Sequence, residues 1–409
     1  MCDALCAIGP RPDGRPYGRG AIFGKNSDRP STEIQLIEYH ARRPTGAQLR
    51  TQYLEVDDPG AFALLGARPD WLWGLEHGVN EHRVAIGNEK VWTRDDPFAA
   101  SPALIGMDLV RLGLERGRTA DDALDHMTAL LGEHGQGGIA DKHSNDSYFS
   151  SFLIADPQTG WILETSGRTW VAAPVEGSAA VSNRVTLRTE WTRASADVAA
   201  GVDWDEWRSL DAPTGHADRR LAASRACLAA RTTESLTPAA FAAHLRDHGS
   251  GPWGAPGSDP DMVSPLPQKA LPDGTGVTVC MHIRRYQNTT SSMIAELPAG
   301  PEAPLRAWVA PGSPCVSVYL PVFPPAAVPP QLGDARVWSR FAALRDRVER
   351  EADALPEIRA VFGPLEAELW AEADEVAGRP DEHAAFVERA WARVEEALGR
   401  VERSASKVM

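Results

Sequence analysis

Cys2 constrains what this chain can become more than any other residue. The chain opens MCDALCAIG, so removal of Met1 would leave a thiol and a free α-amine on one residue. The thiolate is the reactive form, with a pKa of about 8.5 when unperturbed, and the α-amine titrates near ~7.7–8.0. A nucleophile whose base is the N-terminal amine is an established catalytic arrangement. The position of Cys2 alone is equally consistent with a cysteine that has no catalytic role. The residues that follow it are therefore needed to distinguish the two interpretations.

The next thirty residues predict a β-hairpin that brings a charged turn beside Cys2. Short apolar runs at 4–8 and 21–23 flank the polar stretch GPRPDGRPYGRG, a pattern typical of two strands joined by a turn. Lys25 and Asp28 would then lie near Cys2. A cation there favours the thiolate, and a carboxylate can accept a hydrogen bond from the α-amine. By composition alone, GKNSDRP also fits a solvated surface turn.

Two sequence blocks and their order resemble a known family. MCDALCAIG followed by IFGKNSDRPSTEIQ is similar to the opening of the secernin-like dipeptidases, which are cysteine members of the N-terminal-nucleophile hydrolases and distant relatives of bile-salt hydrolases and penicillin acylases. Further blocks that carry the resemblance lie at 71–93, 104–131, 135–138, 152–172, 181–187 and 277–297. The resemblance covers most of residues 1–325. It implies an α+β fold, a four-layer αββα sandwich with two antiparallel sheets between helix layers.

The resemblance also implies an oxyanion hole. Asn183, in VSNRV, matches the block whose Asn side chain donates to the developing oxyanion; one such donor can lower the barrier by roughly 2.7–4 kcal/mol. A structural Asn that caps a strand end is the alternative. The second donor is expected on the strand after Asn80 and Glu81, either as the Asn88 side chain or as a backbone amide at Asn88 or Glu89. Asn80 and Glu81 themselves are expected to bind substrate.

Two cationic positions follow from the same comparison. Bile-salt hydrolases carry an Arg three positions before the matching Asp, where this chain and the secernin-like pattern have Lys25. Because Lys cannot hold a carboxylate bidentately as Arg does, the role of Lys25 is less defined than that of Asp28. A further Arg is expected from the middle of the chain. Arg225, in AASRACL, is the candidate for substrate binding, and a salt-bridged helix surface is its alternative role.

The remaining cysteines predict neither a disulfide framework nor a metal site. Five scattered cysteines are typical of a protein from a reducing cytoplasm. Cys280 and His282 would point to one face of a strand, but no partner pair with zinc-like spacing is apparent in the sequence. We therefore predict no metal and no other cofactor. Cys6 shares the strand face of Cys2 and would be a rival nucleophile only if processing exposed it; Cys280 and Cys6 are expected to be buried.

The composition indicates which classes of molecule this protein can bind. The chain has 409 residues, of which 43% are hydrophobic, as in an ordinary globular protein. It has no apolar run of membrane-spanning length and no secretory signal pattern, which predicts a cytoplasmic protein that does not enter membranes. The net charge of −14 argues against nucleic acid and anionic lipid as partners. A small peptide or amide substrate is expected, and homo-oligomerisation stays open.

A Pro-rich stretch at 321–330 predicts a domain boundary. The predicted domains are a catalytic domain at 1–325 and a helical C-terminal region at 326–409. Apolar residues recur at helical spacing within this region. Its predicted helices cover 337–355, 357–376 and 382–401, with breaks expected at Gly363-Pro364 and at 378–380. One helix over 104–131, one pairing strand over 79–91 and a hairpin around 156–160 are predicted in the catalytic domain.

The resemblance implies a cysteine-type dipeptidase, and the chemistry of Cys2 with its α-amine predicts a thioester on that residue. One alternative is an acylase or acyltransferase that forms the same thioester from N-acyl amides. Another is a non-catalytic interaction protein that docks through its C-terminal helices; the joint presence of Cys2, Asp28 and Asn183 speaks against it. A dipeptide also needs partners for its charged ends. The candidates are Lys25, Arg184 and Arg225 for a carboxylate, and Glu81, Glu89 and Asp146 for an ammonium group.

Overall fold

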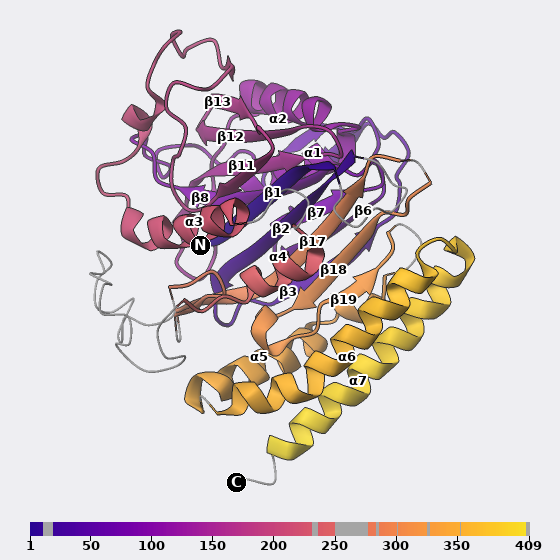
Figure 1. Cartoon of the computed structure of the whole chain (residues 1–409). Coiled ribbons are helices and arrows are strands. Elements are labelled where there is room, and N and C mark those ends of the chain that lie inside the picture. Colours follow the sequence, from indigo (N-terminus) through magenta and orange to yellow (C-terminus); the bar gives the residue numbers. More distant parts are fainter. Residues whose placement is uncertain are drawn as a thin grey trace.

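Two large antiparallel sheets lie face to face at the centre of the molecule, and helices cover their outer faces (Figure 1). The computed structural model describes residues 1–10, 19–230, 236–249, 277–283, 286–300, 302–324, 328–351 and 353–405. The architecture is the expected α+β arrangement of two antiparallel sheets between helix layers. The apolar side chains that the two sheets turn toward each other form one continuous core.

The first sheet is built on the predicted N-terminal hairpin, which is confirmed. β1 (Cys2–Pro10) pairs with β2 (Arg19–Pro30), and Cys2 lies opposite Ser27. Along the sheet the order is β14-β1-β2-β17-β18-β19, with β16 paired to β17. The other strands are β14 (Ser178–Val181), β16 (His282–Ile283), β17 (Gln287–Pro298), β18 (Arg306–Pro311) and β19 (Leu320–Val322). The predicted hairpin turn at 11–18 lies outside the described residues.

The second sheet follows the order β15-β13-β12-β11-β8-β7-β6-β3. Its strands are β3 (Gln35–His40), β6 (Leu64–Pro69), β7 (His77–Asn80), β8 (Ala85–Val91), β11 (Phe149–Ala155), β12 (Gly160–Ser166), β13 (Thr169–Pro174) and β15 (Arg193–Ala194). The predicted hairpin around 156–160 is β11–β12. The single strand predicted over 79–91 is instead two paired strands, β7 and β8, because the chain turns between Asn80 and Ala85. Two small pairs stand apart from it: β4 (Gln48–Arg50) with β5 (Glu55–Asp57), and β9 (Ile139–Asp141) with β10 (Asp146–Ser147).

Two helices cover the outer face of the second sheet. The single helix predicted over 104–131 is in fact two, α1 (Gly106–Arg116) and α2 (Ala120–His134). α1 ends at Gly117, where a side chain would meet the Ala123 Cβ at 2.6 Å. The Thr119 side chain then accepts a hydrogen bond from a backbone N–H of α2 and caps its N-terminus. The chain therefore turns back on itself, and α1 and α2 pack side by side on the sheet.

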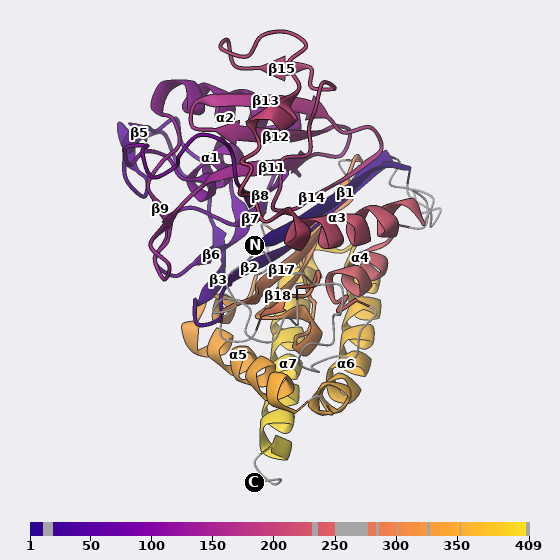
Figure 2. The ribbon, with the colours of Figure 1, turned by 90° about the vertical axis from the view of Figure 1, so that its left-hand side faces the viewer.

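On the outer face of the first sheet lie α3 (Thr214–Ala229) and α4 (Pro238–Leu245), which Figure 2 shows beside β1, β14 and β17. Phe241 of α4 and Leu5 of β1 belong to one buried apolar cluster there. The connection between β15 and α3 contains one short 3-10 helix, η1 (Trp204–Trp207). Other single-turn helices are η3 (Pro314–Val316), η4 (Pro330–Gly333) and η5 (Pro380–Glu382).

The expected C-terminal helical region is present as α5 (Ala335–Arg350), α6 (Ala354–Val376) and α7 (His383–Ala405). These helices pack beside β19 and β3 (Figure 1), and their buried side chains join the core between the two sheets. The predicted boundary at residue 325 lies outside the described residues. The break expected at Gly363-Pro364 does not occur, because Pro364 is exposed on α6 and the carbonyl it leaves unbonded can face water.

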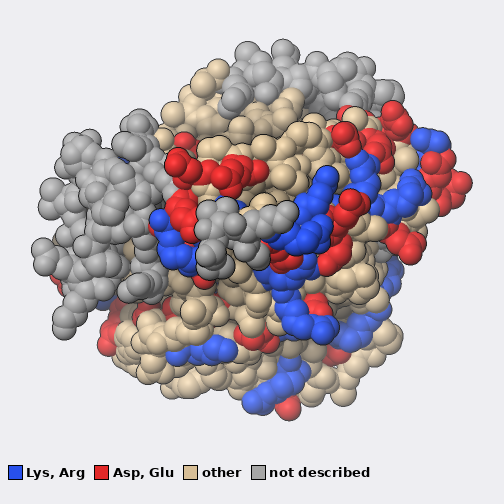
Figure 3. Space-filling view, turned by 90° about the horizontal axis from the view of Figure 1, so that it is seen from below, with Lys and Arg blue, Asp and Glu red and all other residues tan. Residues whose placement is uncertain are grey.

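Charged side chains of both signs are interspersed on the face seen in Figure 3, without a region of one sign. Ion pairs also join the C-terminal helices, such as Arg340 with Glu402 and Arg393 with Glu368. Exposed pairs of this kind contribute little to stability. Over the described ranges, none of the helices combines the length and apolar character that crossing a bilayer requires.

Candidate active site around Cys2

Cys2 opens β1 at the floor of a cavity of about 970 Å³. Successive side chains of a strand point to opposite faces, so the Cys2 side chain faces the second sheet and the Asp3 side chain faces α3. Cys2 is only 5% exposed. Its backbone N–H donates to Asn183 Oδ1 at 2.7 Å, and the nitrogen of Met1 donates to the Asp28 carbonyl at 2.8 Å. The N-terminus is therefore held inside the protein.

Lys25 crosses the core from the first sheet to the second. It is fully buried, and its Nζ donates to the Asn88 carbonyl at 2.6 Å and lies 3.7 Å from Glu76 Oε2. Gly87 makes room for it, because a Cβ at Gly87 would stand 2.5 Å from Lys25 Cδ. Burial alone would lower the pKa of Lys25, but the neighbouring Cys2 and carboxylates raise it above its ordinary value. Lys25 is thus a fixed cation near the Cys2 thiol, where the predicted hairpin placed it.

The sequence analysis missed Glu76, which is the carboxylate closest to the thiol. Cys2 Sγ donates to Glu76 Oε2 at 3.8 Å, and Glu76 Oε1 lies 3.4 Å from Arg29 Nη1. Glu76 is 1% exposed and precedes β7 within the apolar stretch WLWGLEHGV. An ionisable residue inside such a stretch was the available signal, since Glu is almost never fully buried unless it is paired.

The pKa of the Cys2 thiol is raised, chiefly by burial; Lys25 and the N-terminal ammonium oppose the shift, while Glu76 and Asp28 add to it. With Met1 in place the thiol is therefore held protonated, and a base is needed to produce the thiolate. Burial also raises the pKa of the rival, Cys6, to about 12. Cys6 is fully buried between the sheets, so it is a core residue in this fold.

Asp28 lies beside the N-terminus, where the sequence placed it. Its Oδ1 accepts a hydrogen bond from Thr289 Oγ1 at 2.7 Å, and its Oδ2 lies 3.7 Å from Arg220 Nη1. Burial raises the pKa of Asp28, against the opposing charges of the N-terminus and Arg220. Gln287 also accepts a hydrogen bond from the Met1 nitrogen, at 3.1 Å. β17 and β2 thus form the part of the site that surrounds the N-terminal nitrogen.

The arginine of α3 that contacts the N-terminal strand is Arg220, not the expected Arg225. Arg225 lies on the exposed face of α3, away from Cys2. Arg220 is buried on the same helix and donates to Asp3 Oδ2 at 2.6 Å, to Asn183 Oδ1 at 2.7 Å and to the Cys2 carbonyl at 3.1 Å. It therefore holds the first strand from its outer face. The segment ADRRLAASRACL contains three arginines. Which of them reaches the site depends on which face of α3 is buried.

Asn183 binds the N-terminal strand with its oxygen. Oδ1 accepts from both Cys2 and Arg220, while Nδ2 donates to the Lys90 carbonyl at 3.0 Å. One of the two Nδ2 hydrogens is thus used by Lys90, and the other is available for a ligand. The predicted oxyanion role of Asn183 stays a prediction, and its contacts add a second role, which is to orient the nitrogen of Cys2.

Asn88 lines the cavity, but its buried side chain points to α1, where Nδ2 donates a hydrogen bond to Met107 Sδ at 3.4 Å. Its backbone N–H is already bonded to the Glu76 carbonyl at 3.2 Å. The predicted oxyanion donor at Asn88 stays a prediction. Glu89 is fully buried and does not line the cavity.

Asn80 and Glu81 do not reach the cavity, contrary to the prediction. Asn80 is four residues after Glu76 in an extended segment, so the two residues lie about 13 Å apart. Its amide donates to the carbonyls of Leu114 and Gly117, so it braces the end of α1. The Glu81 carboxylate is bound by the side chain of Arg42 and by a backbone N–H. Both side chains therefore make hydrogen bonds within and around the second sheet rather than facing the cavity.

Charged groups of both signs line the cavity. Carboxylates of Glu76, Asp141 and Asp146 stand on its wall, and Lys90 is paired with Asp146. The other cationic residues of the wall are Arg29, Arg345 and Arg350. Of the residues proposed for charged substrate ends, Asp146 lines the cavity, whereas Arg184 is paired with Asp218 near the surface. A lining of this kind suits a small ligand that carries both charges, because each buried charge needs a partner.

Comparison with known proteins finds fold-level likeness only. No protein-family model matches the chain. A Caenorhabditis elegans ortholog of N-acylethanolamine-hydrolyzing acid amidase has 13% identity and a TM-score of 0.39, over 73% of this chain and 94% of that one. A mutant conjugated bile acid hydrolase from Clostridium perfringens has 12% identity and a TM-score of 0.42, over 74% and 88%. Penicillin V acylase from Agrobacterium tumefaciens has 10% identity and a TM-score of 0.39, over 79% and 87%.

We predict that Arg220→Ala destabilises the protein by about 3–5 kcal/mol, because it leaves Asp3 buried without its cation. Urea unfolding followed by circular dichroism measures this. Arg225→Ala on the exposed face of the same helix is the matched control, and its effect should stay within ~0.5 kcal/mol. Equal losses in the two variants would contradict the role given to Arg220.

A second prediction concerns pH. Burial raises the pKa of Glu89 to about 8, above its ordinary 4.5. Between these values the folded state binds more protons than the unfolded state, so this contribution to stability falls as pH rises from 4.5 to 8. Glu89→Gln cannot ionise. The free energy of unfolding of this variant should therefore rise relative to wild type from pH 5 to 8, by at most about 1.4 kcal/mol per pH unit.

The measurement is a urea unfolding series at pH 5, 6.5 and 8. The exposed Glu133→Gln is the control, because its side chain is 73% exposed. Its unfolding free energy should follow that of wild type at every pH. A Glu89→Gln series that also runs parallel to wild type would show that Glu89 is ionised throughout the range.

Proposed function

We propose that this protein is a cysteine amide hydrolase that acts on dipeptides through a thioester on Cys2. One observation carries the proposal: the Cys2 thiol lies at the floor of a charged cavity, 3.8 Å from the Glu76 carboxylate and next to the buried ammonium of Lys25. The first group is a nucleophile, the second can bind a substrate ammonium group, and the third stabilises a thiolate.

The base is the α-amine of Cys2, which becomes available when Met1 is removed. The Cys2 nitrogen already lies 2.7 Å from Asn183 Oδ1, and the Asp28 carbonyl and Gln287 bind the nitrogen that precedes it. The neutral amine takes the thiol proton, and the thiolate attacks the carbonyl carbon of the substrate. The amine returns the proton to the leaving nitrogen as the C–N bond breaks. Water then cleaves the thioester and restores the thiol.

The negative charge that develops on the carbonyl oxygen when the thiolate attacks needs hydrogen-bond donors that are already oriented. Asn88 lies on the wall of the cavity, and Asn183, which binds the Cys2 nitrogen through Oδ1, has a second Nδ2 hydrogen besides the one it donates to Lys90. Donors fixed before the reaction act on charge that appears only in the transition state. The two asparagines come from opposite sheets, so closure of the sandwich sets the distance between them.

Glu76 supports the choice of a dipeptide. In an α-amino acid, the ammonium nitrogen lies about 2.5 Å from the carbonyl carbon, and a thiol poised for attack lies about 3–3.5 Å from that carbon. A carboxylate 3.8 Å from Cys2 Sγ is therefore within reach of the ammonium group of the residue whose carbonyl is attacked. An N-acyl amide has no charge at this position and would leave Glu76 without that partner.

The opposite end of a dipeptide is a carboxylate, which requires a cation. Lys90, Arg345 and Arg350 lie on the cavity wall. The resemblance of the N-terminal motifs to the secernin-like dipeptidases points to the same substrate class. A cytoplasmic location agrees with the free cysteines of the described chain, and it is part of the proposal.

The test compares a free dipeptide, its N-acetyl form, its C-terminal amide and a long-chain N-acyl amino acid. Free dipeptide should be cleaved fastest, and N-acetylation should cut kcat/KM by more than 100-fold, because the charge that Glu76 binds is lost. Glu76→Gln should lose most of the preference for a free amine. Asp141→Asn, another carboxylate of the wall, is the matched control and should keep that preference.

Each outcome separates one alternative. Fast cleavage of the N-acyl amino acid with no cleavage of dipeptide would make the protein an acylase and would overturn the substrate assignment. Transfer to an added amine instead of water would make it an acyltransferase. No turnover of any amide by protein that begins at Cys2 would leave the interaction protein, with its C-terminal helices, as the better reading.

A further inference from the structure

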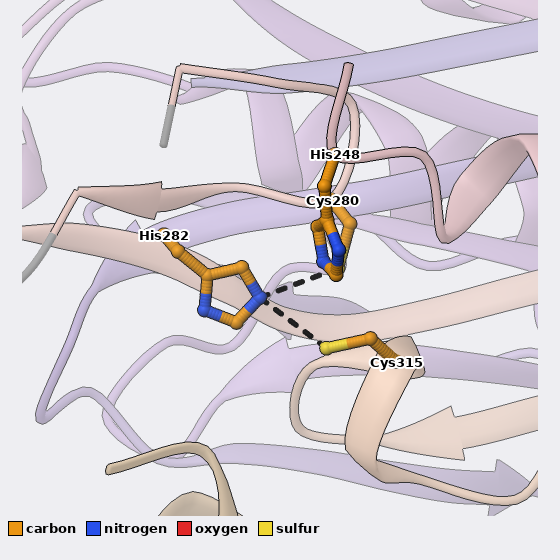
Figure 4. Close-up of side chains that lie close together, drawn as sticks. All are labelled: His248, Cys280, His282 and Cys315. Atoms are coloured by element: carbon orange, nitrogen blue, oxygen red, sulfur yellow. Dashed lines mark hydrogen bonds between the residues drawn. The ribbon is translucent and has the colours of Figure 1, made fainter. Parts of the chain in front are cut away.

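Four side chains outside the Cys2 cavity converge on one point. His248 follows α4, Cys280 and His282 lie at β16, and Cys315 lies in η3. Figure 4 shows the four side chains pointing toward one another. Each offers one donor atom, and these atoms all lie within 4.8 Å of one another. Three separate parts of the chain thus supply two imidazoles and two thiols.

We propose that this cluster binds a zinc ion in a closed, structural site. Two Cys and two His are a tetrahedral zinc donor set, with Zn–S of about 2.3 Å and Zn–N of about 2.0–2.1 Å. At these bond lengths, neighbouring donors around a tetrahedron lie about 3.3–3.8 Å apart. His282 Nε2 lies 3.5 Å from Cys280 Sγ and 3.3 Å from Cys315 Sγ. The spacing is therefore that of a metal-binding site.

The surroundings of His282 support the assignment. Its Nδ1 lies 2.9 Å from Glu349 Oε1, which also accepts a hydrogen bond from Asn288 Nδ2 at 2.6 Å. A carboxylate on the far nitrogen of a metal-binding imidazole fixes the ring and leaves the other nitrogen for the metal. Here Nε2 is the nitrogen that faces the sulfurs. The ring is 2% exposed, so water does not compete for it.

Burial and ligand number indicate the class of site. Cys280, His282 and Cys315 are buried, and His248 is partly buried. Four protein ligands fill a tetrahedral ion, so no position remains for a substrate or an activated water. The site therefore holds parts of the chain together and takes no part in chemistry. Zinc fits better than calcium or magnesium, which prefer oxygen ligands.

The site connects to the Cys2 cavity through one hydrogen-bonded chain. The backbone N–H of Met281, between two of the ligands, donates to Thr289 Oγ1 at 2.9 Å. Thr289 Oγ1 in turn donates to Asp28 Oδ1 at 2.7 Å. Zinc bound to Cys280 and His282 would therefore fix the segment that positions Asp28. This consequence holds whatever the substrate of the enzyme is.

The sequence analysis predicted no metal because Cys280 and His282 had no partner pair at zinc-like spacing. The partners are 32 residues before Cys280 and 35 residues after it, at His248 and Cys315. Only folding brings them together. A free thiol–imidazole cluster and a Cys280–Cys315 disulfide are the competing descriptions, and both exclude a bound ion at this point.

The test measures the metal content of the full-length protein, purified without chelator, by inductively coupled plasma mass spectrometry. One zinc per chain is expected. X-ray absorption at the zinc edge should show two sulfur and two nitrogen neighbours at about 2.3 and 2.0 Å. Cobalt exchanged into the site should give the intense visible absorption of tetrahedral cobalt–thiolate. These readouts use the unaltered chain, so they do not depend on whether a variant folds.

Single substitutions test which residues bind the metal ion. Cys280→Ser and Cys315→Ser should each lower the zinc content at least tenfold, whereas Cys227→Ser, on α3 and outside the cluster, should keep one zinc per chain. Protein without stoichiometric metal that also fails to bind added zinc or cobalt would overturn the proposal. So would a Cys280–Cys315 disulfide found by peptide mass spectrometry in protein kept under reducing conditions.

Discussion

A buried ammonium group organises this molecule. Lys25 leaves the first sheet, passes Gly87 and ends against the Asn88 carbonyl and Glu76, all of which belong to the second sheet or its lead-in. An unpaired charge in this position would cost several kcal/mol, so the two sheets must approach closely enough to supply its partners. That same approach brings the Cys2 thiol to Glu76. The contact that stabilises the sandwich is therefore also the contact that builds the candidate active site.

The first strand is held from both of its faces. On the inner face the thiol meets the Lys25–Glu76 pair, and on the outer face Asp3 meets Arg220 from α3. Because successive side chains of a strand point in opposite directions, two consecutive residues place the Cys2 thiol in the cavity and its anchor, Asp3, against the helix layer on the other side. The strand must be fixed in this way, since a nucleophile displaced by 1 Å can lose about 100-fold in rate.

Local patterns predicted the local parts of this structure. The hairpin, Lys25 and Asp28 lie within thirty residues of Cys2, where turn chemistry and strand alternation are informative. The position of Glu76 and the cluster of His248, Cys280, His282 and Cys315 depend on contacts between distant segments, which no local sequence pattern predicts. Arg225 was chosen over Arg220 on a short motif. Five residues on a helix place two side chains about 140° apart, so only one of them can face the sheet, and the packing of α3 decides which.

The central claim is that Cys2, with its α-amine free, carries the acyl group during turnover. Top-down mass spectrometry of protein quenched in acid during hydrolysis of a slow activated ester tests it most directly. The account predicts a chain that lacks Met1 and carries one acyl group, with fragment ions that place the acyl group on Cys2. An active chain that retains Met1, or an acyl group on another cysteine such as Cys6, would contradict it.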